Sequence, residues 1–179
     1  MSDALSDVLE SRTDIRVPAR AGVTELFHLH YRRLVGLARL LVDDRETAED
    51  VVQEAFEGLY RRWRRLRDPH TAAAYLNRSV VNGARSRLRH RATERAHILP
   101  DAGLSPSAEA TGVAHDAEHA LTDAVLALPR RQREVVVLRY YLDLSEEQIA
   151  EWLGVSPGSV KQHAQRATTT LQERMESWS

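Results

Sequence analysis

The 179-residue chain has no cysteine, which excludes disulfides, thiolate metal clusters and a cysteine nucleophile. It has no apolar run near the roughly 18 residues of a membrane-spanning helix, and its first 20 residues lack the apolar core of a signal peptide. Aromatic residues make up 6% and there are 8 glycines, which limits how much a single core could bury. The lack of cysteine, of a membrane span and of a signal peptide predicts a soluble cytoplasmic protein. The few aromatic residues and glycines favour several compact units over one large domain.

Lysine is almost absent, because 24 of the 25 cationic residues are arginine. The net charge of −1 argues at first against a nucleic-acid partner, but the charges are unevenly placed. Residues 1–55 have a net charge of −4, residues 56–95 of +8, residues 96–123 of −5, and residues 124–179 are neutral. Blocks of opposite charge indicate separate surfaces for separate partners.

The acidic third block also carries scattered proline, glycine and serine, which is typical of a linker. We therefore expect a loose tail over residues 1–22, an N-terminal domain over 23–95, an acidic linker over 96–115 and a C-terminal domain over 116–179. Apolar residues recur at helical spacing and strand-like alternation is absent, so the expected fold class is all-α.

The first predicted helix begins at Thr24 as N-cap, and Asp43 with Asp44 ends it and opens the next. Its expected apolar face comprises Phe27, Tyr31, Leu34, Ala38 and Leu41. In the second helix a polar stripe lies opposite the apolar one, at offsets 0, 3, 4 and 7. Its members are Asp50, Gln53, Glu54 and Glu57. This stripe is either a solvated helix face or a docking face for a basic partner.

A break at Asp68 and Pro69 precedes a third predicted helix, with Thr71 as its cap. One face of this helix combines an aromatic, three guanidinium groups and an amide: Tyr75, Arg78, Asn82, Arg85 and Arg89. Arginine binds phosphates, an aromatic ring can stack on an unpaired base, and asparagine can read a base edge. A basic solvated face is the alternative.

The most specific pattern is in the C-terminal domain. Ser145 and Gln148 form a capping-box pattern, Gly154 permits a tight turn, and Ser156 with Pro157 opens another helix. A short helix, a turn and a capped second helix are the plan of the helix-turn-helix motif, whose second helix enters the major groove. We expect that helix to expose Ser159, Lys161, Gln162, His163, Gln165 and Arg166, and to bury Val160, Ala164 and Ala167. The alternative is a helical hairpin that does not bind DNA.

Residues 143–167, DLSEEQIAEWLGVSPGSVKQHAQRA, resemble domain 4 of a sigma-70 family factor. The stretch DDRETAEDVVQEAFEGLYRRW, followed by AYLNRSVVNGARSRLRHR, resembles domain 2 of that family. Two domains without a domain 3 resemble the extracytoplasmic-function (group IV) class. The resemblance implies a bacterial sigma factor, not an enzyme, that needs no cofactor and directs promoter-specific initiation by core RNA polymerase. The arginine excess is compatible with a GC-rich, actinobacterial genome.

The resemblance also implies roles for the faces described above. The stripe of Asp50, Gln53, Glu54 and Glu57 would bind the clamp helices of the polymerase β′ subunit, and domain 4 would contact the β flap. The residues implied to capture and melt the promoter −10 element are Arg67, Asp68, His70, Tyr75, Asn77, Arg78, Asn82, Arg85 and Arg89. Those implied to contact the −35 element are Ser156, Ser159, Lys161, Gln162, His163, Gln165 and Arg166.

Many family members carry cationic or small polar residues where this chain has Gln162 and His163, so a relative's −35 sequence does not transfer. The family's linker threads through a basic cleft of the polymerase. The acids Asp101, Glu109, Asp116 and Glu118 are therefore either an RNA mimic or part of a solvated tether. Any anti-sigma factor would be a separate polypeptide, and nucleoid association would follow from assembly with polymerase.

Two other classes of protein compete with this interpretation. A metalloenzyme could use His28 with His30, or His115 with His119, but neither pair has further ligands at suitable spacing, so we expect no metal site. A stand-alone helix-turn-helix regulator of the response-regulator type would share the C-terminal motif. It would also require an α/β receiver domain, which the helical N-terminal half disfavours.

Overall fold

The computed structural model describes residues 19–42, 44–66, 68–98 and 117–176. They form the following helices in chain order: α2 (Ala19–Arg39), α3 (Arg45–Leu66), α4 (Pro69–Ile98), α5 (Ala117–Leu126), α6 (Arg130–Val136), the π-helix η1 (Val137–Tyr141), α7 (Glu146–Leu153) and α8 (Pro157–Glu176). These ranges contain no strand, which confirms the all-α prediction. None of the described helices combines the length and apolar character needed to cross a bilayer.

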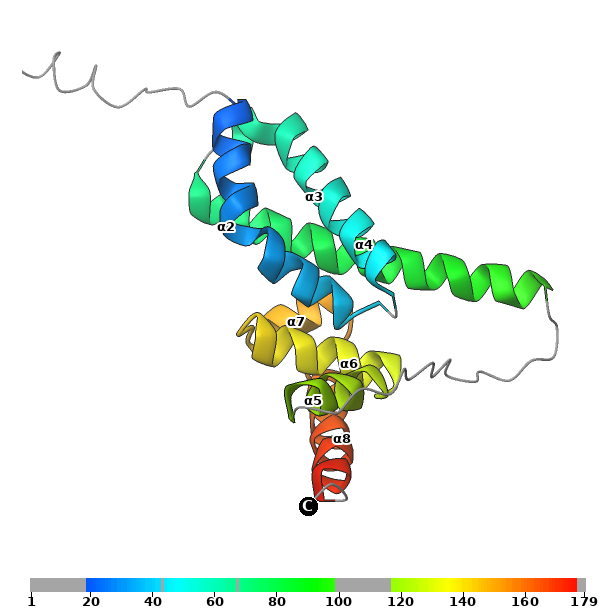
Figure 1. The fold of residues 1–179 in the computed structure, drawn as a ribbon. Coiled ribbons are helices and arrows are strands. Elements are labelled where there is room, and N and C mark those ends of the chain that lie inside the picture. The colour runs from blue at the N-terminus through cyan, green and yellow to red at the C-terminus, as the bar shows by residue number, and fades with distance from the viewer. Residues whose placement is uncertain (1–18, 43, 67, 99–116, 177–179) are drawn as a thin grey trace, which may run out of the picture.

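Helices α2, α3 and α4 pack together as one bundle (Figure 1). Leu34 and Leu37 of α2 are buried, as are Leu41 in the turn that follows α2 and Val51 and Leu59 of α3. The predicted apolar face of α2 is wrong at Phe27, which is 38% exposed and stacks on Tyr31 with ring centroids 4.5 Å apart. The main core therefore comes from the face that carries Leu34 and Leu37.

Two predicted helix starts are also wrong. Helix α2 begins at Ala19, so Thr24 is interior. The earlier start is explained by packing, because Gly22 lies against the Trp63 ring and Ala19 packs on the core. Helix α4 begins at Pro69 and is capped by Asp68 rather than Thr71, since the Thr71 backbone N–H donates to Asp68 Oδ2 at 2.8 Å.

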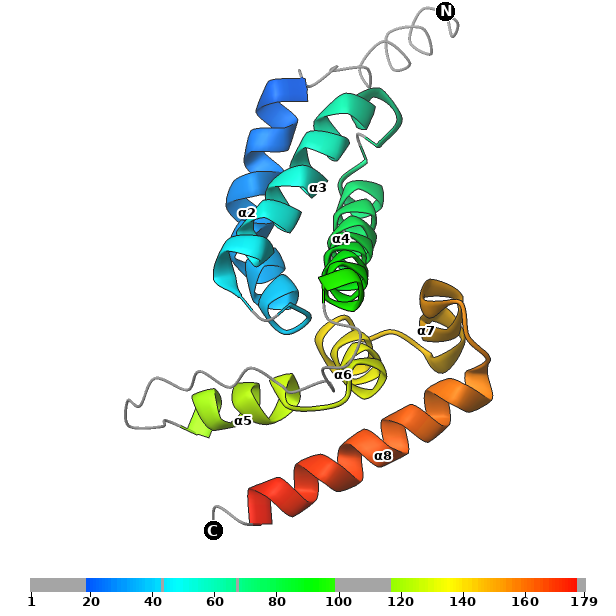
Figure 2. The ribbon, with the colours of Figure 1, turned by 90° about the vertical axis from the view of Figure 1, so that its right-hand side faces the viewer.

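Helices α5 to α8 form the second unit, in which α5, α6 and α7 pack against α8 (Figure 2). Val135, Leu138 and Ile149 are fully buried there. In the same unit Val160, Ala164 and Ala167 are buried, as predicted. Helix α4 lies beside α6 and α7, and buried residues of both units belong to one connected apolar cluster.

The domain boundaries stay predictions. Residues 1–18 and 99–116 lie outside the described residues, and with them most of the predicted linker and the acids Asp101, Glu109 and Asp116. Asp43, Arg67 and His115 also lie outside them, and so do the side chains of Glu118 and His119.

Candidate nucleic-acid and protein interfaces

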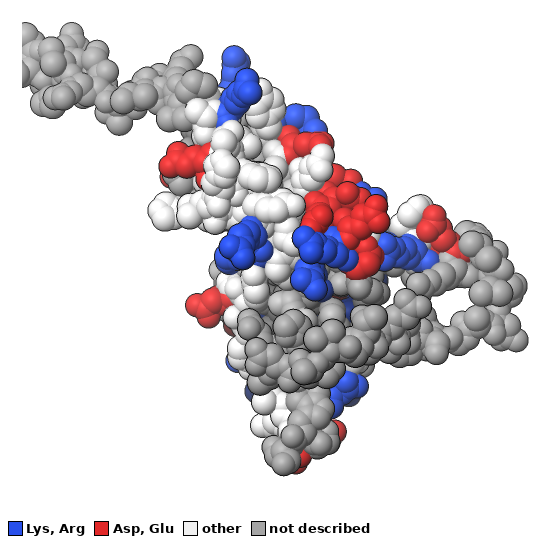
Figure 3. Space-filling model, viewed as in Figure 1, with Lys and Arg blue, Asp and Glu red and all other residues white. Residues whose placement is uncertain are grey.

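The polar stripe of α3 forms as one exposed face. Asp50, Gln53, Glu54 and Glu57 are all exposed, and Figure 3 shows acidic side chains gathered over α3 with arginines beside them. Glu54 pairs with Arg87 of α4, and Gln53 Nε2 donates to Glu57 Oε1 at 3.3 Å. The structure thus brings the four residues together, and Gln53, Glu54 and Glu57 already make contacts within the protein.

The start of α3 is fixed by Asp44. Its Oδ1 accepts the Thr47 backbone N–H at 2.7 Å, and its Oδ2 lies 2.8 Å from Arg91 Nη1. Partial burial tends to raise the pKa of Asp44, but the hydrogen bonds from Thr47 and Arg91 outweigh it and hold this pKa below its ordinary value. The carboxylate therefore caps α3 and ties it to α4.

The predicted −10 residues begin at the turn between α3 and α4, of which Arg67 lies outside the described residues. Asp68 and His70 are exposed there. The hydrogen bonds from Thr71 lower the pKa of Asp68, so this carboxylate is ionised at neutral pH as the cap of α4. Asp68 thus has a structural role that the sequence pattern assigned to Thr71.

The predicted −10 face of α4 is divided among several environments. The Tyr75 hydroxyl accepts a hydrogen bond from Arg62 Nη1 at 3.1 Å, and its ring lies 5.8 Å from the Arg62 guanidinium. Asn77 Oδ1 accepts from Arg33 Nη1 at 3.2 Å. Asn82 and Arg89 are exposed. Among the predicted residues on the described part of α4, His70, Asn82 and Arg89 are therefore the most open to a ligand.

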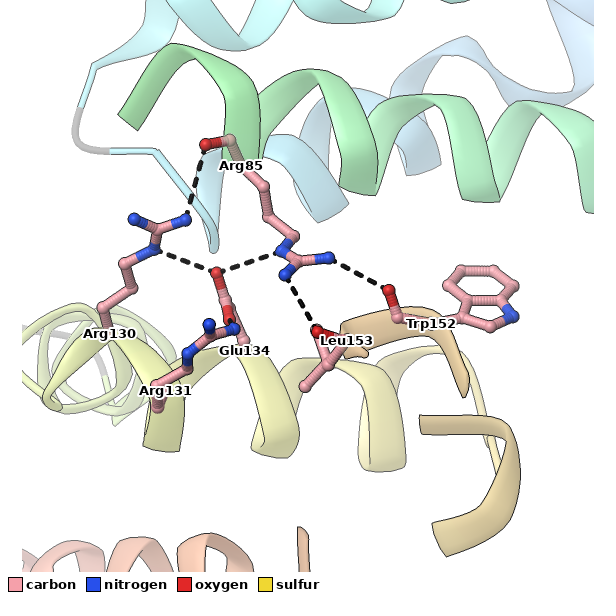
Figure 4. A network of polar contacts seen from close by, with 6 residues as sticks. All are labelled: Arg85, Arg130, Arg131, Glu134, Trp152 and Leu153. Atoms are coloured by element: carbon pink, nitrogen blue, oxygen red, sulfur yellow. Dashed lines mark hydrogen bonds and ion pairs between the residues drawn. The ribbon is translucent and has the colours of Figure 1, made fainter. Parts of the chain in front are cut away.

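Arg78 and Arg85 both contact the second unit, Arg78 from an exposed position and Arg85 from a largely buried one. Arg78 Nη2 lies 3.2 Å from Glu151 Oε1, and Arg85 donates to the backbone carbonyls of Trp152 and Leu153 at 3.0 and 3.2 Å (Figure 4). Burial lowers the pKa of Arg85, and the charge of Glu134 opposes that effect. Carbonyls at the end of α7 have no partner within the helix, which explains why a guanidinium binds there.

The helix-turn-helix forms as predicted. The Gln148 backbone N–H donates to Ser145 Oγ at 3.3 Å, and the Gln148 side chain accepts from the Ser145 N–H at 2.8 Å, which completes the capping box. Gly154 has φ 66°, in the left-handed region that glycine adopts readily. Ser156 Oγ accepts the Ser159 N–H at 3.2 Å and caps α8.

Most of the predicted −35 residues are exposed on α8. Ser156, Lys161, Gln162, Gln165 and Arg166 are exposed, whereas Ser159 and His163 are partly buried. An open groove beside this helix is lined by Gln132, Gln162, Gln165, Arg166, Thr169, Thr170 and Glu173. Gln132 comes from α6 and was missed by the sequence analysis, because periodicity within one helix does not identify its neighbour.

Among the described residues, no group of three or more His, Asp or Glu side chains is placed to hold a metal ion. What the arrangement offers is recognition: an exposed acidic stripe, a basic helix and a capped helix-turn-helix on one chain. A helix-turn-helix of this kind is typical of DNA-binding proteins.

The chain belongs to the sigma-70 family of RNA polymerase sigma factors. Residues 26–94 match the family model for Sigma-70 region 2, and residues 118–171 match that for Sigma-70 region 4. It is an alternative sigma factor of the extracytoplasmic-function class, which binds core RNA polymerase and promoter DNA and directs promoter-specific transcription. Sigma factors are non-enzymatic initiation factors, and the stand-alone regulator is not favoured.

Similar proteins occur in actinobacteria. The RNA polymerase sigma-E factor of Streptomyces avermitilis is 38% identical over 146 residues, covering 80% of this chain and 79% of the relative. The ECF RNA polymerase sigma factor SigM of Mycobacterium tuberculosis is 34% identical over 155 residues, covering 85% and 76%.

Two solved structures share the fold. The sigma factor RpoE of Bartonella quintana, in complex with the anti-sigma factor NepR, has a TM-score of 0.63 and 22% identity, over 86% of this chain and 96% of that one. CnrH, in complex with the cytosolic domain of CnrY, has a TM-score of 0.56 and 24% identity, over 89% and 90%. At these identities the likeness concerns the fold alone.

Proposed function

We propose that the acidic stripe of α3 is the surface that binds the β′ clamp helices of core polymerase. Supporting this, Asp50 and Glu57 are exposed on the bundle face opposite the buried Val51 and Val52. Carboxylates on such a face attract a basic partner and accept its hydrogen bonds. Glu54 takes part only if its ion pair with Arg87 is exchanged for one with the polymerase.

The α3–α4 turn and α4 then act on the −10 element. A melted base needs a surface for stacking and edge hydrogen bonds, which an exposed amide, a tyrosine and neighbouring arginines provide. Asn82 supplies the amide, and Arg89 one of the phosphate contacts. Tyr75 would have to exchange its contact with Arg62 for one with a base.

Helix α8 reads the −35 element in the major groove. Lys161 and Arg166 suit phosphates or guanine edges, and Gln162 and Gln165 suit adenine edges. Gln132 lies on the same groove and extends the contact surface to α6. The β flap would contact this domain. The chain performs no chemistry of its own and acts in the cytoplasm at the nucleoid, where its partners are found.

The observation that carries this function is the presence, on one chain, of the exposed α3 stripe and the helix-turn-helix. It is tested by the double substitution Asp50→Arg and Glu57→Arg. Both side chains are exposed, so the fold should persist, and affinity for core polymerase should fall at least about tenfold, equivalent to about 1.4 kcal/mol.

Affinity is measured by titrating labelled protein with purified core enzyme. The control is Glu25→Arg, which reverses an exposed charge on α2 outside the stripe. If the double variant and the control bind core polymerase equally well, the stripe is not the docking surface.

A further inference from the structure

The groove beside α8 combines polar side chains from two helices. Gln132 of α6 lines it, together with one face of α8 whose members stand at offsets 0, 3, 4, 7, 8 and 11. These members are Gln162, Gln165, Arg166, Thr169, Thr170 and Glu173. The two threonines donate their hydroxyl hydrogens to backbone carbonyls of the preceding turn, at 3.2 and 3.0 Å. The side chains of Gln162, Gln165 and Arg166 are exposed and form no hydrogen bond or ion pair with another described residue.

The side-chain carbonyl of Gln132 is buried without a partner among the described residues. Its Oε1 is inaccessible to solvent, and no residue in the described ranges donates a hydrogen bond to it. Folded proteins pair nearly all such atoms, because a buried acceptor without a donor destabilises the fold. An apolar side chain of the same length would fill this place without that cost. The carbonyl is therefore suited to a partner that is positioned only when a ligand binds.

Among the side chains that line the groove, the Arg166 guanidinium suits this carbonyl best. It has five N–H donors and no acceptor, so one donor can bind Gln132 while two parallel donors bind the DNA. A hydrogen bond from a charged donor is also stronger than one from an amide such as that of Gln165. The last side-chain torsion of glutamine is broad, and turning the carbonyl towards Arg166 breaks no hydrogen bond of Oε1 with a described residue. Glu173 forms no ion pair with Arg166 in the described part of the chain, so it does not compete for this guanidinium.

We propose that Gln132 is a positioning residue for recognition of the −35 element. When α8 binds DNA, Gln132 Oε1 accepts an N–H of Arg166 and fixes the plane of the guanidinium. The remaining donors of Arg166 then meet a guanine edge or a phosphate in a single orientation. Gln132 thus acts through Arg166, and this inference rests on the function proposed above for α8.

The test is a double-mutant cycle read on −35 discrimination, the ratio of the holoenzyme's affinities for two promoter fragments. One fragment is selected by the unmodified holoenzyme from fragmented genomic DNA, and the other is identical except for a scrambled −35 element. Gln132→Met keeps the length of the side chain and removes the carbonyl. It should lower the discrimination about tenfold, because a hydrogen bond to a charged donor is lost. In the Arg166→Ala background the same change should have almost no effect.

Two further measurements separate positioning from packing. In thermal unfolding of the free chain, Gln132→Met should be at least as stable as the unmodified protein, because the unpartnered carbonyl is gone. Gln132→Glu retains an acceptor oxygen and should keep the discrimination, since its charge weakens both complexes alike. The matched control is Gln172→Met, which makes the same chemical change at an exposed position of α8 outside the lining of the groove. It should change neither the discrimination nor the stability.

The inference is overturned if Gln132→Met keeps the discrimination of the unmodified protein, or if it lowers the discrimination equally with and without Arg166. A lower melting temperature with unchanged discrimination would show that Gln132 only packs α6 on α8. If Gln132→Met does not fold, the cycle is run with Gln132→Leu, which also lacks the carbonyl. If the unmodified holoenzyme itself does not discriminate between the fragments, the proposed −35 function of α8 fails, and the inference fails with it.

Discussion

Arginine side chains have three different roles in this molecule, according to what faces each one. Arg87 and Arg91 join α4 to acidic side chains on α3 and at its start. Arg85 is largely buried between the units. Arg166 is exposed on the helix that we assign to the −35 element. Only the last of these three environments leaves the guanidinium open to phosphate.

The role of Arg166 predicts a change in the salt dependence of promoter binding. Arg166→Ala should weaken the holoenzyme–promoter complex, and the slope of log affinity against log salt should fall by about 1 if the side chain contacts a phosphate. The measurement is a binding titration of reconstituted holoenzyme at several salt concentrations.

Arg166→Lys is the matched control, because it keeps the charge and loses the bidentate geometry. If Arg166→Lys keeps the slope of the unmodified protein, Arg166 contacts a phosphate. If Arg166→Lys behaves like Arg166→Ala, Arg166 contacts a base. Equal affinity and slope for Arg166→Ala and the unmodified protein would remove Arg166 from the interface.

At the scale of helices, the predicted starts are right for some helices and wrong for others. Ser145, Ser156 and Asp44 were predicted as caps and each makes the capping hydrogen bond. These motifs are local, so the sequence contains the whole signal. Thr24 and Thr71 also fitted a local cap pattern. Packing of Gly22 on Trp63 and the Asp68–Pro69 pair started the helices earlier.

The cap of α3 predicts a pH dependence. The pKa of Asp44 is lowered in the folded state, so its stabilising contribution is present above the unfolded pKa of about 3.9 and is lost as the pH falls through the lower folded pKa. Asp44→Asn keeps the capping geometry and removes the charge. Because the side chain is 42% exposed, the expected loss at pH 7 is only about 0.5 kcal/mol.

Thermal unfolding of both proteins between pH 7 and pH 3 measures this effect. The two stabilities should begin to converge as the pH falls below the unfolded pKa of about 3.9, and they should meet only below the lower folded pKa of Asp44. Glu25→Gln, on the exposed face of α2, is the control. A stability difference that stays constant down to pH 3 would show that the charge of Asp44 does not stabilise α3.

At the scale of the whole molecule, the sequence predicts which residues share a helix face. It does not predict which helices contact each other. Two of the hydrogen bonds that join the units link residues 67 and 108 positions apart, Arg85 with Trp152 and Arg33 with Tyr141. Helical periodicity carries no information about such pairs. This is why Arg78 and Arg85 were predicted on a DNA-facing surface and are found against α7, and why Glu134, Tyr141 and Gln132 were not singled out.

The net charge of the whole chain was also a poor guide to its partners. A total of −1 conceals a block of +8 over residues 56–95, much of which forms α4 and the end of α3. Part of this positive charge is used within the protein, where Arg87 and Arg91 pair with acidic side chains. The remainder, including Arg89, is available to DNA.

Transcription in vitro from a genomic template library, with purified protein and core polymerase, tests the proposed function most directly. We expect discrete start sites downstream of shared −10 and −35 sequences. With Asn82→Ala, initiation should fall on duplex templates and recover on templates opened in advance at the −10 element. Tight binding to duplex DNA without polymerase, together with no promoter-specific transcript in its presence, would contradict the account.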